Sequence, residues 1–183
     1  MIYSTLRGAF RERVGRNPQP SAAIMDAQSV KPVEESAGIC GFDGYKRVKG
    51  RKRHLLVDTL GLPITADVTP ADVSDPVGAC RLLAGLAPLV PRLAKIWADQ
   101  AYQGQELAAW GKAEGGWELE IVERRPGTRG FTVQPRRWVV ERTFGWLCRN
   151  RRFSKDYERK VQTSETLLQV AMIRLLLARL GKA

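Results

Sequence analysis

Residues 135–152 place one carboxylate among several arginines in a pattern that is typical of a helix. Apolar residues at helical spacing form a stripe on one side of this segment: Val140, Phe144 and Leu147. Glu141 falls at the edge of the stripe, and Arg137 precedes it by four residues, a spacing at which two helix side chains meet. A carboxylate held beside a core and among cations suits a metal site next to a polyanion. An amphipathic helix with one surface ion pair explains the same spacing equally well.

Two further carboxylates stand where α/β proteins often place their sites. Asp26 lies late in a predicted strand over residues 22–30, and Asp99 follows a predicted strand over residues 93–98. Ligand sites in open α/β sheets gather at strand ends. Three converging carboxylates repel one another unless a cation lies between them. Two Mg²⁺ ions would neutralise the three acids and clamp the attacking and leaving oxygens of a phosphoryl transfer.

Each of these acids also has an ordinary structural explanation. Asp26 suits a turn near a strand end, and Asp99 suits the cap of a following helix. Asp58 and Asp67 also lie near strand ends, where a hairpin turn accounts for them. Spacing alone therefore does not single out three of the nineteen acidic residues.

The charge balance points to an anionic partner. Thirty Lys and Arg residues against nineteen acidic residues give a net charge of +11, which favours nucleic acid or, less often, a membrane surface. Residues 46–53 hold six basic and no acidic residues, and residues 124–160 hold twelve basic and three acidic residues. Two such runs predict a surface that follows a phosphate backbone. The alternative is a solvated surface or a localisation-like patch.

The composition limits the kind of metal and the compartment. The three cysteines are far apart and form no CxxC pair, so neither a zinc site nor a disulfide framework is predicted. His54 is the single histidine, which leaves oxygen ligands and hence a hard cation such as Mg²⁺ or Mn²⁺. The first residues contain no apolar run of a signal peptide, and arginines interrupt the apolar run 167–180. We expect a soluble intracellular protein with no membrane partner.

Hydrophobic periodicity and turn residues predict an α/β order around one mixed sheet. The predicted strands cover residues 22–30, 54–59, 62–68, 93–98 and 117–123, the second and third forming a hairpin around Gly61. The predicted helices cover residues 75–89, 105–113 and 135–152, with a last helix from residue 163. Residues 1–16 have the pattern of a helix tail, and residues 17–21 that of a linker.

Four segments closely resemble the catalytic domain of bacterial insertion-sequence DDE transposases, and the resemblance extends from about residue 22 to residue 180. They are MDAQSVK at 25–31, GRKRHLLVDTLG at 50–61, IWADQAYQG at 96–104 and PRRWVVERTFGWLCRNRRFSKDYER at 135–159. The resemblance implies a ribonuclease-H-like fold, with a mixed sheet of about five strands flanked by helices, over residues 22–183. It also implies DNA strand cleavage and strand transfer that depend on two Mg²⁺ or Mn²⁺ ions.

Carried over by motif, the resemblance makes Asp26, Asp99 and Glu141 the catalytic, metal-binding triad. Arg137 would orient Glu141 or contact phosphate. The glutamate of this group often belongs to a Tyr, Arg, Glu and Lys signature, of which Arg137 and Glu141 are present. Two positions differ from the signature: Gln134 stands at the tyrosine position and Cys148 at the lysine position. Arg149 follows Cys148 on the same helix face and would substitute for the lysine.

The resemblance also implies the partners. Residues expected to bind the DNA backbone are Lys49, Arg51, Lys52, Arg53, Arg149, Arg151 and Arg152. Trp138 and Trp146 would stack on distorted DNA ends or pack in the core. The DNA partners would be transposon ends and target DNA, bound by a homo-oligomer in the nucleoid-associated cytoplasm.

Members of the family usually carry a helical DNA-binding region ahead of the first aspartate, whereas about 25 residues precede Asp26 here. We therefore expect residues 1–21 to be a residual helix and linker of a mostly missing region. The chain would be a degenerate copy or the second frame of a frameshifted element. The rival functions are an inactive remnant that binds DNA and a nuclease of the same fold.

Overall fold

The computed structural model describes residues 2–33, 39–123 and 136–181. Its helices are α1 (Ile2–Arg13), α2 (Asp75–Leu83), α3 (Gln105–Gly115), α4 (Trp138–Cys148) and α5 (Val161–Leu180). Its strands are β1 (Ala22–Val30), β2 (Gly41–Asp43), β3 (Val48–Asp58), β4 (Pro63–Pro70), β5 (Lys95–Ala98) and β6 (Glu118–Ile121). Short 3₁₀ turns cover Ala87–Leu89, Gln100–Tyr102 and Arg151–Phe153. The predicted basic loop 124–133 and the signature position Gln134 lie outside the described residues.

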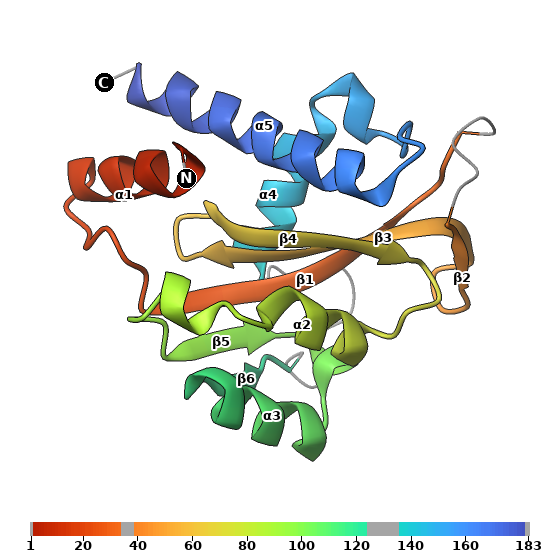
Figure 1. The fold of residues 1–183 in the computed structure, drawn as a ribbon, viewed down its shortest axis with the longest axis horizontal. Helices are drawn as coiled ribbons and strands as arrows, with labels where there is room; N and C mark the ends of the chain where they lie inside the picture. Colours follow the sequence, from red (N-terminus) through yellow and green to blue (C-terminus); the bar gives the residue numbers. More distant parts are fainter. Residues whose placement is uncertain (1, 34–38, 124–135, 182–183) are drawn as a thin grey trace.

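The strands form one mixed sheet with β1 at its centre (Figure 1). β1 pairs antiparallel with β3 on one side and parallel with β5 on the other. β4 extends the antiparallel half and β6 the parallel half. The sheet has six strands, one more than expected, because the three-residue strand β2 adds to the start of β3.

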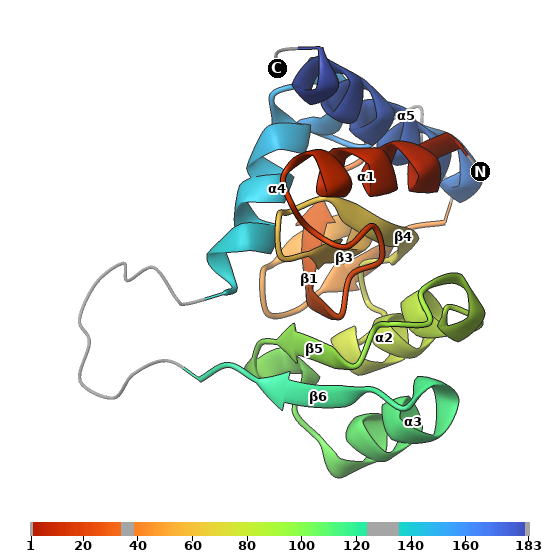
Figure 2. The ribbon, with the colours of Figure 1, turned by 90° about the vertical axis from the view of Figure 1, so that its left-hand side faces the viewer.

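Helices cover the sheet on both faces, and strand alternation divides the core between them. On one face Ile24 of β1 packs in a cluster with buried residues of α4 and α5. On the other face Ala23 and Met25 pack in a cluster with buried residues of α2. Figure 2 shows α1, α4 and α5 on one side of the strands and α2 and α3 on the other.

Local signals explain the strand and helix boundaries that the sequence predicted. β1 has the predicted bounds, and α2 starts at the predicted Asp75. α2 ends at Leu83 rather than near residue 89, because Gly85 takes a left-handed conformation with φ of +68°. At the hairpin, Gly61 has φ of +80° and Asp58 accepts the N–H groups of Leu60 and Leu62.

The terminal helices pack together on the sheet. α1 contacts α5, and Tyr3 and the partly buried Phe10 join the core on that face. A buried ion pair between Arg11 and Asp58 ties α1 to the end of β3. Helix α1 is therefore part of the packed structure and not an isolated arm. Across the described ranges, no helix is both long and apolar enough to cross a membrane.

Candidate active site

Asp26 lies in the middle of the central strand. It pairs in register with Leu55 of β3, and one of its carboxylate oxygens accepts the N–H of Ala27 at 2.8 Å. The pKa of Asp26 is raised to about 6, mainly by burial and also by the negative charge of Asp99, while Arg137 and Lys46 act in the opposite direction. The mutual influence of the two aspartates is the repulsion that a cation between them would relieve.

Asp99 follows β5, and its two carboxylate oxygens have different partners. Its Oδ1 accepts the N–H of Ala101 at 2.9 Å and so caps the short 3₁₀ turn Gln100–Tyr102. Its Oδ2 lies 3.3 Å from Nη2 of Arg137. The capping explanation is therefore confirmed for one oxygen of Asp99, and the role of this residue in the site stays a prediction that concerns the other oxygen.

Helix α4 brings Glu141 and Arg137 to the same place. The predicted apolar stripe of Val140, Phe144 and Leu147 is buried, which seats the helix against β1 and β3. Arg137 Nη2 lies 3.6 Å from Glu141 Oε1, as the four-residue spacing predicted. The same nitrogen also reaches Asp99, so one guanidinium links the end of β5 to α4.

The arrangement fits a hard cation in part. The donors are carboxylate oxygens, and Asp26 and Asp99 are close enough for one charge to raise the pKa of the other. Within the described parts of the chain, however, no group of three or more acidic, histidine or cysteine side chains is placed to hold an ion. Arg137 occupies the position between Asp99 and Glu141 that a cation would take. Asp26 and Asp99 therefore fit a metal, whereas Glu141 is joined to them through a guanidinium.

A polar cleft of about 640 Å³ opens beside Asp99. Its lining includes Asp99 and Arg137 together with Lys46, Lys52 and Asp75. A separate cavity of about 220 Å³ lies among apolar residues of α1, β4 and α5, and no acidic side chain lines it. The cleft is therefore the place where a charged substrate would meet the carboxylates.

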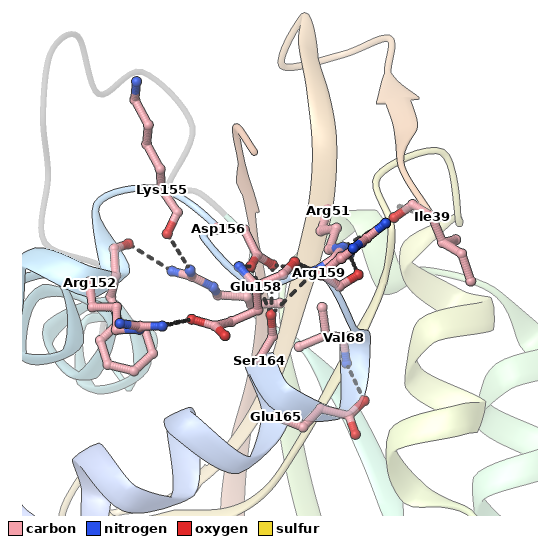
Figure 3. Close-up of polar contacts among 12 residues, drawn as sticks. Ile39, Arg51, Val68, Arg152, Lys155, Asp156, Glu158, Arg159, Ser164 and Glu165 are labelled. Carbon is pink, nitrogen blue, oxygen red and sulfur yellow. Dashed lines mark hydrogen bonds and ion pairs between the residues drawn. The ribbon is translucent and has the colours of Figure 1, made fainter. Parts of the chain in front are cut away.

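Part of the predicted DNA-binding run is buried. Arg51 is fully buried and donates to the carbonyl oxygens of Glu158 at 2.7 Å and Arg159 at 2.9 Å, and it pairs with Asp156 at 3.3 Å (Figure 3). Arg53 is 3% exposed and donates to two further carbonyl oxygens, those of Phe153 and Lys155. The prediction that Arg51 and Arg53 bind DNA is wrong, because both hold residues 153–159 against β3.

Lys52 points to the other face of β3 and is also engaged inside the protein. Its ammonium lies 2.9 Å from Asp75 and 2.8 Å from the carbonyl oxygen of Val73, and the residue is 6% exposed. Its predicted contact with the outer DNA backbone is corrected to a supporting role in the cleft wall. Lys49, Arg149 and Arg151 are exposed, and Arg152 is exposed beside Glu158 at 2.7 Å.

The two tryptophans on α4 pack on arginines. Arg142 lies over the ring of Trp138 at 4.4 Å and over that of Trp146 at 4.5 Å. Trp138 remains 40% exposed beside Arg137. Sequence reasoning missed Lys46 and Asp43 as cleft residues; the Asp43-Gly44 pair is the turn signal that would have placed them at a hairpin.

Solved structures share this architecture. A chain of the simian T-cell lymphotropic virus intasome, solved with the PP2A regulatory subunit B56 gamma, matches 84% of this chain and 48% of its own length with a TM-score of 0.53 and 19% identity. The catalytic core domain of BIV integrase matches 85% of this chain and 82% of its own length with a TM-score of 0.49 and 18% identity. The fold is the expected ribonuclease-H-like one.

Sequence comparison identifies the family. A Burkholderia cepacia protein assigned as the transposase of insertion sequence element IS402 is 29% identical over 128 residues, which cover 66% of this chain. The match spans 60% of the length of that relative. Residues 17–176 match the family described as the transposase DDE domain. The expected membership is confirmed, and the chain belongs to the transposase DDE domain family.

Proposed function

We propose that this chain catalyses the DNA chemistry of an insertion-sequence transposase: metal-dependent cleavage at the element ends and transfer of the resulting 3′ ends to target DNA. The observation that supports the proposal is that Arg137 pairs with both Asp99 and Glu141 beside a polar cleft, while Asp26 is close enough to Asp99 for its pKa to respond to that charge. The family match and the net charge of +11 support DNA as the substrate.

Asp26 and Asp99 would hold divalent ions, and Glu141 would complete the set. Two Mg²⁺ or Mn²⁺ ions would supply activation of a water or a DNA 3′-hydroxyl and stabilisation of the leaving oxygen. The Ala101 N–H fixes the Asp99 carboxylate, and the Ala27 N–H fixes that of Asp26. Arg137 pairs with Asp99 and Glu141, lines the cleft and is proposed to contact a phosphate there.

The proposed DNA surface is smaller than the basic runs predicted. Its members are the exposed cations Lys49, Arg149, Arg151 and Arg152. Trp138 is proposed to contact distorted DNA ends, because it is partly exposed one residue from Arg137. We also propose a homo-oligomer on DNA, a nucleoid-associated cytoplasmic location, and a catalytic domain over residues 22–183.

A nicking assay tests the proposal. Supercoiled plasmid is incubated with Mn²⁺ or Mg²⁺ and the parent, the Asp99→Asn variant or the Glu106→Gln variant, which alters an exposed acid on α3. We expect the parent and Glu106→Gln to nick, and Asp99→Asn to nick at least about 100-fold more slowly, because a metal site contributes several kcal/mol to such reactions. Equal nicking by Asp99→Asn and the parent would show that the triad assignment is wrong.

One rival function has an observation in its favour. The guanidinium between Asp99 and Glu141 would suit an inactive chain that binds DNA without cleaving it. Salt-sensitive DNA binding without nicking in either metal would favour that remnant. A nuclease of the same fold would nick the plasmid but would give no strand-transfer product when a pre-cleaved element end and target DNA are supplied.

A further inference from the structure

A turn close to Asp26 contributes to the lining of the cleft. Residues 43–47 join β2 to β3 and are called here the 43–47 turn. Asp43 is 7% exposed and holds the turn together: one oxygen accepts the N–H groups of Tyr45 at 3.1 Å and Lys46 at 2.9 Å, and the other accepts the Ser29 hydroxyl at 2.5 Å. The backbone of the turn is therefore fixed from within, which leaves its outer side chains available for contacts.

Lys46 joins this turn to the central strand. Its ammonium donates to the carbonyl oxygen of Ala27 at 3.0 Å, and Ala27 follows Asp26 directly. Its positive charge acts on Asp26 and lowers the pKa of that carboxyl. An ammonium has three N–H donors, so the bond to Ala27 uses one of them. Lys46 lines the same cleft as Asp99 and Arg137, which places a cation in the cleft near the acids.

Tyr45 stands beside Lys46 and is 96% exposed. It also lines the cleft. Proteins that bind nucleic acid strands combine cations along the backbone with aromatic rings on which bases stack. A fully exposed ring next to a cleft lysine matches that combination. Lys52 also lines the cleft, but its ammonium is already bound to the carboxylate of Asp75 and to the carbonyl oxygen of Val73.

We propose that the 43–47 turn is a DNA-strand-binding element of the active-site cleft, in which Lys46 binds a phosphate next to the reacting one and Tyr45 stacks on the adjacent base. This inference rests on the proposed function, because it takes DNA as the occupant of the cleft. On this proposal the 43–47 turn positions the substrate and takes no part in the chemical step. The loss of either contact should therefore weaken DNA binding while the carboxylates remain in place.

The salt dependence of DNA binding tests the role of Lys46. Binding of a fluorescent DNA duplex is measured by anisotropy without divalent ions, so that the DNA stays intact. Each phosphate contact adds about 0.9 to the slope of log affinity against log salt concentration. We expect Lys46→Gln to lower the slope by about this amount and Lys46→Arg to keep it. Lys112→Gln removes an equally exposed charge from α3 and should leave the slope unchanged. A slope for Lys46→Gln equal to that of the parent would overturn the proposal.

Replacements of Tyr45 test the stacking contact by anisotropy with a fluorescent single-stranded oligonucleotide, whose bases are free to stack. Tyr45→Ala should bind this strand about 5- to 100-fold more weakly, and Tyr45→Phe should bind like the parent, because stacking requires the ring and not the hydroxyl. Parent-like binding by Tyr45→Ala would remove the base contact from the proposal. These binding results are independent of nicking. A parent that fails to nick would argue against the proposed function alone. A nicking protein whose Lys46→Gln variant keeps the parent's salt slope would argue against the role of the 43–47 turn alone.

Discussion

Replacing Arg51 by methionine should destabilise the fold and leave the DNA salt dependence unchanged. Arg51 is fully buried and pairs with Asp156, which is 1% exposed. The guanidinium also donates to the carbonyl oxygens of Ile39, Glu158 and Arg159. Methionine fills a similar space but has no donor, so the buried carboxylate of Asp156 would lose its cation.

The structure sets the size of the effect. Removing one partner of a buried ion pair costs about 3–5 kcal/mol. Asp156 keeps two other donors in the variant, the hydroxyl of Ser164 at 2.8 Å and the N–H of Glu158 at 3.0 Å. The Arg51–Asp156 distance of 3.3 Å is also long for a charged hydrogen bond. We therefore expect the lower limit, about 3 kcal/mol, which lowers the melting temperature of a chain of this length by about 6–12 °C.

Circular dichroism during urea and thermal unfolding measures this loss, and Arg152→Met is the matched control. Arg152 pairs with Glu158 at 2.7 Å, but its side chain is 62% exposed, so its loss should cost at most about 1 kcal/mol. Adding Asp156→Asn to Arg51→Met should recover part of the stability, because an amide costs less to bury than a carboxylate that has lost the Arg51 cation. The reasoning would be refuted if Arg51→Met were no less stable than Arg152→Met, or if folded Arg51→Met lost about 0.9 from the salt slope.

Two other residues give separate predictions. Burial lowers the pKa of His54 to about 4. As the pH falls from about 6.5 to 4, His54 is protonated in the unfolded chain but not yet in the folded one. This difference should lower the free energy of unfolding by about 3 kcal/mol. Urea unfolding of His54→Gln should not show this loss at low pH. A variant whose stability depends on pH as strongly as that of the parent would contradict the prediction. Arg137→Gln should bind Mn²⁺ up to about fivefold more tightly by calorimetry, because a competing cation is removed. Weaker binding would mean that Arg137 helps to form the metal site.

The elements with strong local signals were predictable from the sequence. The apolar run 22–30 and the Asp75-Pro76 pair marked β1 and the start of α2. The start of β3 was not predictable in the same way: the strand begins at Val48, six residues before the predicted 54, inside a run of lysines and arginines. The run forms a strand because its backbone pairs with β1 and its arginine side chains donate to carbonyl oxygens of residues 153–159. Neither partner is local in sequence.

The candidate site was predictable in its members but not in its connections. Spacing alone indicated the Arg137–Glu141 contact, because both residues lie on one helix. The choice of Asp26 and Asp99 among the acids required the family resemblance. The contact of Arg137 with Asp99 joins α4 to β5 and has no counterpart in local spacing. The position of Lys46 beside Ala27 likewise follows from the β1–β3 pairing, which folds the 43–47 turn back over the central strand.

The members of the basic runs contribute to different free energies, and strand geometry separates those of the run 46–53. In a strand, alternate residues face opposite sides, so Arg51 and Arg53 share the face that residues 153–159 cover, whereas Lys52 faces the cleft wall. Arg149 and Arg151 follow the end of α4 and remain exposed. Buried cations are compensated by fixed carboxylates and carbonyls, so they act on the free energy of unfolding. Exposed cations can neutralise phosphates and release the counterions condensed on DNA, so they act on salt-dependent binding. A count of charges along the sequence therefore overestimates the DNA surface wherever a basic run enters a sheet.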